Sequence, residues 1–150
     1  MPRAQLTLAT MLLGLTLAGC DALRGSAPLP TPADFGTFAT ELLARGITIS
    51  SVVSGDPGCD DQTLAPTAIA FKASGKDQAS PVQIRVYLFK DDATLERRRA
   101  DVDACAAAWA TDPATFELVD ASPFVLAGQG PWGDAFKVAL SASIRNAAGD

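Results

Sequence analysis

Hydrophobic and polar positions divide the chain into one leading apolar run and a longer part made of short, regularly patterned segments. Residues 6–17 form the apolar run, which holds no charged residue, and Arg3 precedes it. These twelve residues are too few for a helix that crosses the hydrocarbon core of a membrane, which takes about 20. A short apolar run behind a positive residue is typical of a secretory signal segment, which is removed after export.

The first of three segments with helical spacing follows a Pro-containing stretch. Thr31 is expected to cap this helix, Pro32 to take its first position and Asp34 to complete a capping box. Gly46 is expected to end it. The apolar face of this predicted helix comprises Phe35, Phe38, Ala39, Leu42 and Leu43.

Two further helices are predicted in the second half of the chain. One covers residues 91 to about 110 and begins with two acids at the positive end of its dipole. Its apolar stripe includes Cys105 and Trp109. The other follows Trp132, with an inner face made of Phe136, Ala139, Leu140, Ile144 and Ala147.

Alternation of apolar and polar residues predicts five strands, at residues 47–53, 67–72, 82–90, 116–119 and 123–127. The third strand is the clearest, because every second residue from Val82 to Leu88 is apolar. The order α-β-β-β-α-β-β-α predicts an α+β fold: a two-layer sandwich with a mostly antiparallel sheet of about five strands and three helices. We expect one sheet face to pack on helices and the other to be at least partly open.

The end of the apolar run carries the residues Leu17-Ala18-Gly19-Cys20. This motif resembles the lipobox of bacterial lipoproteins, in which the cysteine carries a diacylglycerol and further acyl chains such as palmitate. The resemblance implies that residues 1–19 are a signal peptide and that Cys20 anchors the chain to the membrane. The alternative is an ordinary signal peptide in which the cysteine is coincidental.

The residues after Cys20 suggest a tether and a location. Residues 20–30 combine the lipidated cysteine with a Pro- and Gly-containing stretch that has no apolar periodicity, which predicts a flexible linker to one domain at residues 31–150. Asp21 resembles a signal for retention at the inner membrane in bacteria that have two membranes. The layout after the tether is similar to that of small α+β lipoproteins of bacteria, a resemblance that implies no catalytic residues.

Charge and cysteine content narrow the classes of partner. The whole chain has a net charge of −5, and removal of Arg3 with the signal segment makes it more negative. This charge argues against nucleic acid as a partner and against adsorption on anionic headgroups. Cys59 and Cys105 remain as a pair in an exported chain, and we predict that they form a disulfide. The alternative is two free thiols, with Cys105 buried and Cys59 exposed.

The residues Gly128-Gln129-Gly130-Pro131-Trp132-Gly133 spell a dinucleotide-binding fingerprint between a predicted strand and a predicted helix. We reject a nucleotide site, because too few residues follow for the second parallel strand that such a site needs. The preferred interpretation is a Gly-rich turn with Trp132 packed on the core.

The residue types of the chain give little support to a catalytic or a metal site. The chain has no histidine, which removes Ser-His-Asp and Cys-His catalysis and makes zinc a poor fit. Hydrolysis by paired carboxylates remains an alternative, and the acids that are close in sequence are Asp60 with Asp61, Asp91 with Asp92, and Asp101 with Asp103. Calcium binding by Asp56, Asp60 and Asp61 lacks the ligand spacing of known loops. We expect no cofactor and no metal.

The strand at 82–90 suggests a binding surface. Arg85, Tyr87 and Phe89 share the side of this strand that faces away from the apolar positions. Aromatic residues beside arginine are enriched at recognition surfaces, so this face is a candidate site for an envelope protein or a small ligand. The alternative is that a helix or loop covers the face. The sequence thus favours a lipid-anchored, non-catalytic binding or accessory domain outside the cytoplasmic membrane, with an envelope hydrolase or a structural cell-wall component as the alternatives.

Overall fold

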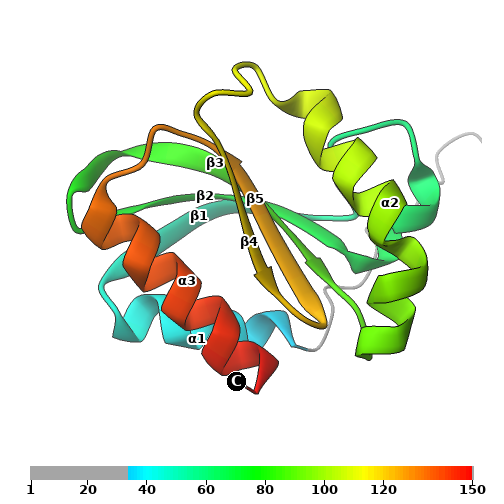
Figure 1. Cartoon of the computed structure of the whole chain (residues 1–150). Coiled ribbons are helices and arrows are strands. Elements are labelled where there is room, and N and C mark those ends of the chain that lie inside the picture. The colour runs from blue at the N-terminus through cyan, green and yellow to red at the C-terminus, as the bar shows by residue number, and fades with distance from the viewer. Residues whose placement is uncertain (1–33, 150) are drawn as a thin grey trace, which may run out of the picture.

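Five antiparallel strands form the centre of the fold (Figure 1), in the order β1-β2-β3-β5-β4. The computed structural model describes residues 34–149. The strands are β1 (Ile47–Ser54), β2 (Ala68–Gly75), β3 (Gln78–Leu88), β4 (Phe116–Ala121) and β5 (Phe124–Gln129). Tight turns join β2 to β3 and β4 to β5, whereas residues 55–67 connect β1 to β2. Strands β3 and β5 pair across the long excursion that contains the second helix and β4.

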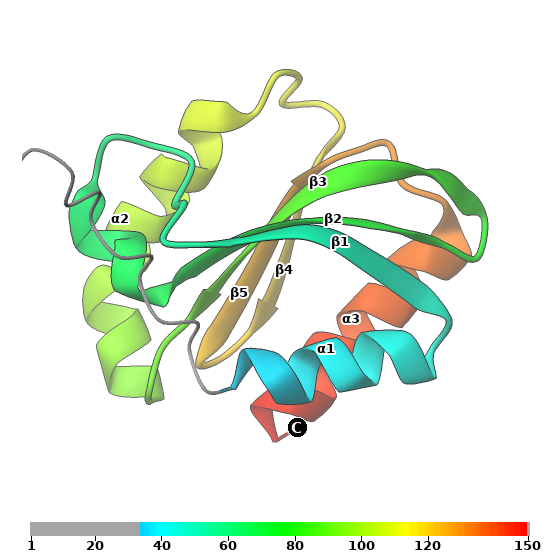
Figure 2. The same cartoon turned by 180° about the vertical axis from the view of Figure 1, so that it is seen from behind.

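Helices lie on both faces of this sheet. Helices α1 (Phe35–Ala44) and α3 (Asp134–Ala148) lie side by side on one face, and α2 (Asp92–Trp109) crosses the other, as Figures 1 and 2 show. A 3-10 helix, η2 (Gln62–Thr67), lies beside α2. We refer to the two sides as the α1–α3 face and the α2 face.

The larger hydrophobic core lies beneath the α1–α3 face. Every second residue of β2 and β3 points into it, so that Phe71 pairs with Ile84 and Ile69 with Val86 across the ladder. Aromatic rings from both layers meet there in edge-to-face contacts, as between Phe38 and Phe71 with centroids 6.0 Å apart. Such contacts add to the stabilisation from apolar burial. This core therefore holds the two helices and the sheet as one unit.

A smaller core lies beneath the α2 face. The buried residues of this cluster are Leu64, Ala68, Tyr87, Phe89, Leu95, Val102, Cys105 and Val125. They come from η2, three strands and α2, and they cover one end of the sheet only. At the other end of the same face, Thr48, Ser50 and Lys72 are exposed. That end of the fold has two layers, the sheet and the pair of helices α1 and α3. Over the rest of the sheet, α2 forms a third layer.

The predicted α+β class, with a five-stranded antiparallel sheet and three helices, is confirmed. The predicted element boundaries agree with the observed ones within a few residues. The capping box at the first helix is wrong in one respect: α1 begins at Phe35, and Asp34 makes no side-chain capping bond. Thr31 and Pro32 lie outside the described residues, as do the signal peptide, Cys20, Asp21 and the tether. The sequence did not predict η2, because a short turn that contains Pro66 has no apolar period.

Within residues 34–149, no helix combines the length and the apolar character that crossing a membrane requires.

Candidate ligand groove

The side chains expected to form a binding face are covered. Tyr87 is fully buried and Phe89 is 3% exposed, because α2 and the segment before β2 pack over them. Arg85 keeps only 13% of its side chain exposed. The interpretation of Arg85, Tyr87 and Phe89 as an open recognition surface is therefore wrong, and the alternative of a covered face is correct. The rings of Tyr87 and Phe89 pack in the smaller core beneath α2.

A disulfide between Cys59 and Cys105 joins the covering segment to α2. It confirms the predicted pairing, with the two Cα atoms 5.2 Å apart. The Tyr87 hydroxyl donates a hydrogen bond to the carbonyl oxygen of Pro57 at 2.7 Å, which fixes the segment from beneath. The Cys105 sulfur lies 3.0 Å from the same oxygen but has no proton to donate, because it is in the disulfide. Burial raises the pKa of the Tyr87 phenol, so the hydroxyl keeps its proton at neutral pH.

Arg85 completes this covered region. Its guanidinium lies 4.6 Å from the centroid of the Trp109 ring, and the same group pairs with Asp56 at 3.0 Å. Gly58 passes so close that a Cβ there would come within 2.4 Å of the Trp109 ring. The space beside Arg85 is thus filled by protein atoms, and the cluster is structural.

The glycines of the rejected dinucleotide fingerprint are explained by packing. A Cβ on Gly128 would come within 2.2 Å of the Trp132 ring, which folds back over the end of β5. A Cβ on Gly130 would lie 2.5 Å from the carbonyl oxygen of Thr115. Trp132 is 7% exposed and donates its indole hydrogen to the carbonyl oxygen of Gln129 at 3.1 Å. The segment is therefore a Gly-rich turn with its tryptophan on the core.

The N-terminus of α3, where a bound phosphate would lie, is occupied by Asp77. Its carboxylate accepts hydrogen bonds from the backbone amides of Ala135 at 3.0 Å and Phe136 at 2.9 Å. These bonds hold the pKa of Asp77 below its ordinary value. They also fasten the β2–β3 turn, which carries Asp77, to the first turn of α3.

The carboxylates that were considered for hydrolysis or calcium mostly serve local structure. Asp91 caps α2 by accepting the Thr94 amide at 2.7 Å, and the Thr94 hydroxyl and amide lower the pKa of Asp91. Asp61 likewise accepts from Thr63, whose hydroxyl lowers the pKa of Asp61. A lowered pKa is the opposite of what a general acid needs. No group of three or more metal-binding side chains is placed to hold an ion in the described part of the chain.

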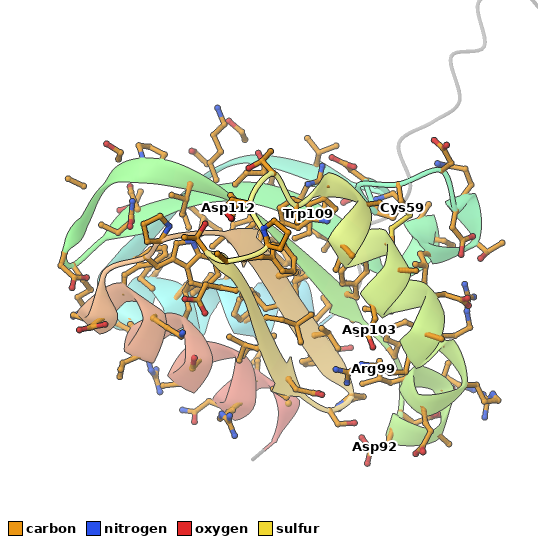
Figure 3. The ribbon with its side chains drawn as sticks, turned by 45° about the horizontal axis from the view of Figure 1, so that its top comes forward. Cys59, Asp92, Arg99, Asp103, Trp109 and Asp112 are labelled. Atoms are coloured by element: carbon orange, nitrogen blue, oxygen red, sulfur yellow. A yellow bond between two sulfur atoms is a disulfide. The ribbon has the colours of Figure 1, made fainter. Side chains whose placement is uncertain are left out.

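A mixed cleft of about 320 Å³ lies between the start of α2 and the β4–β5 turn. Its walls are formed by Asp92, Leu95, Glu96, Arg99, Asp120 and Ser122. Figure 3 shows Asp92, Arg99 and Asp103 along this side of α2. Arg99 pairs with both Asp103 and Asp120, and Asp92 accepts the Ser122 hydroxyl at 2.8 Å. These contacts occupy Asp92 and Asp120, two of the three acids that line the cleft.

A groove of different character lies on the α1–α3 face. It has a volume of about 570 Å³ and is almost entirely apolar in its exposed lining. The residues that line it are Arg45, Lys76, Asp134, Ala135, Val138, Ala139 and Ala142. The floor belongs to α3, and the end of α1 and the β2–β3 turn, which lie against each other where Ile47 pairs with Gly75, form its side.

The groove is hollow because α3 presents small side chains there. Ala135, Ala139 and Ala142 follow one another at helical spacing, and each removes the bulk that a leucine would place in the same position. Val138 stands at the margin with 68% of its surface exposed, which is unusual for a large apolar side chain beside an apolar floor.

The two cations of the groove are positioned by separate parts of the scaffold. Arg45, at the end of α1, pairs with Glu41 at 2.5 Å, and Glu41 accepts the Asn146 amide of α3 at 3.2 Å. Lys76 sits in the β2–β3 turn with a left-handed backbone, at φ +55°, next to the Asp77 that holds the turn to α3. Among the described residues, no carboxylate pairs with Lys76. Asp134, the first residue of α3, is the single acid of the lining.

Sequence reasoning missed this groove. Its lining residues come from the end of one helix, a turn and another helix, so no local pattern brings them together. The available signal was weak: three alanines at helical spacing next to an apolar Val138 that lies outside the predicted inner face of that helix. Comparisons with models of known protein families, with curated proteins and with solved structures found no match to this chain.

Proposed function

We propose that this chain is a non-catalytic binding domain, anchored by lipid on Cys20 and exposed outside the cytoplasmic membrane, that uses the groove along α3 to hold its ligand. The observation that carries the binding function is the groove itself: an open hollow with an apolar floor on α3 and a few polar groups at its margin. Ligand sites in proteins are concave, largely apolar and of this size.

The location outside the membrane is supported by two independent features. The Cys59–Cys105 bond is of the kind that persists in oxidising compartments and is rare in the cytosol. The motif at residues 17–20 has the order of a cleavage and lipidation site. Asp21 supports retention at the inner membrane where the cell has two membranes.

Metabolic labelling tests the anchor. Cells that express the chain are grown with labelled palmitate, and the protein is isolated together with a Cys20→Ala variant. We expect label on the parent chain, none on the variant, and a parent N-terminus at residue 20. An unlabelled parent chain that retains Met1 would contradict the proposal.

Photo-crosslinking in intact cells tests the binding function. A photoreactive residue is placed at Val138 in the groove and, as a matched control, at Ser50, which is exposed on the open end of the opposite face. We expect adducts of a defined mass from position 138 and none of that mass from position 50. Equal adducts from both positions would favour a structural component with no specific groove ligand.

A further inference from the structure

We propose that the side of the domain formed by β1 and the outer flank of α1 is a self-association surface, on which a second copy of this chain adds its own β1 antiparallel to the first. The two five-stranded sheets then form one continuous sheet across the pair. This inference goes beyond the proposed function and depends neither on the groove nor on the lipid anchor.

β1 is an edge strand of the sheet. One side of β1 pairs with β2, and no described strand pairs with its other side. An edge strand presents backbone N–H and C=O groups to which a further strand can hydrogen-bond. Proteins commonly block such pairing with charged side chains or proline on the edge. β1 contains neither, since its sequence is ITISSVVS.

The opposite edge strand, β4, does carry charged side chains. Glu117 and Asp120 lie on its two faces, where they form ion pairs with Lys137 and Arg99. A strand added to β4 would displace or desolvate these charges, which is costly. The two edges of the sheet therefore differ, and β1 is the edge that favours a further strand.

The outer flank of α1 continues the surface beside β1. α1 contacts β1, whereas α3 contacts β4 and β5, and Figure 2 shows α1 on the β1 side of the sheet. Glu41 faces α3, where it accepts the Asn146 amide, and Leu43 lies about 200° further round the helix, on the flank away from α3. Leu43 is 59% exposed, and Val52 and Val53 of β1 are 44% and 52% exposed. Large apolar side chains that are exposed thus gather on this side.

Charge favours a second copy as the occupant. Residues 35–54, which contain α1 and β1, hold only two charged residues, Glu41 and Arg45, and these pair with each other at 2.5 Å. Residues 55–67 and 85–123, which include α2 and the segment packed beside it, hold eleven acids and five bases. Copies of a chain with a net charge of −5 repel each other where their acidic surfaces meet. The neutral side lets two copies approach, and a neutral apolar surface is complementary to itself.

A two-fold axis perpendicular to the sheet gives the arrangement. It runs the two β1 strands antiparallel and places both α1 helices on the same face of the joined sheet. Residues 47–50 pair regularly with β2, so we expect the new ladder there, before the bulge at Ser51, whose φ is +53°. The ten residues of α1 extend for only about 15 Å. The interface is therefore at the small end of the range for specific complexes, and the dimer should form reversibly.

The test uses the mature chain, residues 20–150, carrying Cys20→Ser so that no lipid contributes to association. Sedimentation equilibrium measures its mass at concentrations from about 1 μM to about 1 mM. We expect monomers at the lower end and dimers at the upper end. Amide hydrogen exchange should slow at residues 47–50 as the concentration rises and should not change in β4.

Substitutions test the two parts of the surface. Thr48→Lys places a charge at an exposed position of β1 and should weaken dimerisation at least about tenfold, although it lowers the net negative charge of each copy. Leu43→Glu should have the same effect through the flank of α1. Leu118→Glu, at an exposed apolar position of β4, makes the same change of charge as Leu43→Glu and should dimerise as the parent does. Melting temperatures measured at low concentration check that each variant folds.

The inference is overturned by a chain that stays monomeric up to about 1 mM. It is also overturned by dimers that persist in both Thr48→Lys and Leu43→Glu, or by dimers that Leu118→Glu abolishes. Slow exchange at residues 47–50 in a chain that is monomeric at every concentration would show that another segment of the same chain covers the edge. None of these outcomes bears on the groove, which the photoreactive residue at Val138 tests separately.

Discussion

The two faces of the sheet are covered by helices in different ways. Beneath the α1–α3 face lies a continuous apolar core in which Phe38, Phe71 and Phe136 have no exposed surface. Beneath α2 lies a smaller cluster that is supplemented by a disulfide, a buried phenol bond and the Arg85–Asp56 pair. Apolar burial is non-directional and is shared among many residues. The disulfide and the polar contacts beneath α2 are few, so the packing of α2 against the sheet depends on individual residues.

The two faces therefore differ in how firmly their helices are held against the sheet. A groove on the α1–α3 face rests on the more firmly packed layer, which favours a preformed site. The α2 face is held by contacts that respond to reductant and to pH. Substitutions on the two faces should therefore differ in how much stability they cost and in which helix they loosen.

Phe71→Ala should lower the free energy of unfolding by about 3–5 kcal/mol, because it leaves a cavity in the larger core. Phe71 is fully buried and meets the rings of Phe35 and Phe38. Urea denaturation measures the loss. Leu43→Ala, at a position that is 59% exposed, is the control and should change stability by less than about 0.5 kcal/mol. A similar loss in both variants would mean that this face is not a tightly packed core.

Replacing both cysteines, as Cys59→Ala with Cys105→Ala, should cost about 2–4 kcal/mol, because the bond closes a segment of 46 residues in the unfolded chain. Hydrogen exchange should accelerate more in α2 than in α3, since only α2 is tied by the disulfide. Reductant added to the parent chain should have the same effect. Equal acceleration in both helices would show that the two faces unfold as one unit.

Tyr87→Phe should cost about 1–3 kcal/mol, because the carbonyl oxygen of Pro57 then loses its buried donor. The same group predicts a pH dependence. Burial raises the pKa of Tyr87 above its ordinary value of 10.0, so its contribution to stability is complete below pH 10 and declines as the pH rises further. Denaturation at several alkaline pH values measures this decline, which should be shallower in the variant. An identical alkaline profile in both chains would remove the assignment to Tyr87.

Asp77→Asn should have the smallest effect at neutral pH. The backbone amides of Ala135 and Phe136 lower the pKa of Asp77, so its contribution is present above the unfolded value of 3.8 and is lost as the pH falls below it. The parent chain should therefore be more stable than the variant at pH 7, and the two should converge in acid. Melting temperatures across this range measure the difference. A gap that persists in acid would mean that the charge of Asp77 is not what holds α3.

Local patterns in the sequence predicted most of the elements. Alternation in β3 and helical spacing in α1 and α3 reflect which side chains meet the larger core, so periodicity was a sufficient guide. The acidic start of α2 was also predicted, and Asp91 at this start caps the helix by accepting the amide of Thr94, three residues away. The start of α1 was misjudged, since Thr31-Pro32 offered a stronger local signal than Asp34-Phe35.

The candidate site was not predictable in the same way. Tyr87 and Phe89 carry no mark that distinguishes an open face from one covered by α2, because an exposed and a buried aromatic look alike in a strand pattern. The groove depends on how closely the end of α1 and the β2–β3 turn approach α3. That approach is set by Asp77 and Glu41, whose partners are distant along the chain.

Sequence patterns were sufficient to predict the α+β class and the pairing of the last two cysteines, and they give the expectation of a lipid anchor on Cys20. Each of these depends on residue type or spacing over short distances. The folded chain was needed to see which sheet face α2 covers, what surrounds Arg85 and where the groove lies. The physical reason is that burial and hollows arise where elements from separate parts of the chain meet, and local periodicity does not encode those meetings.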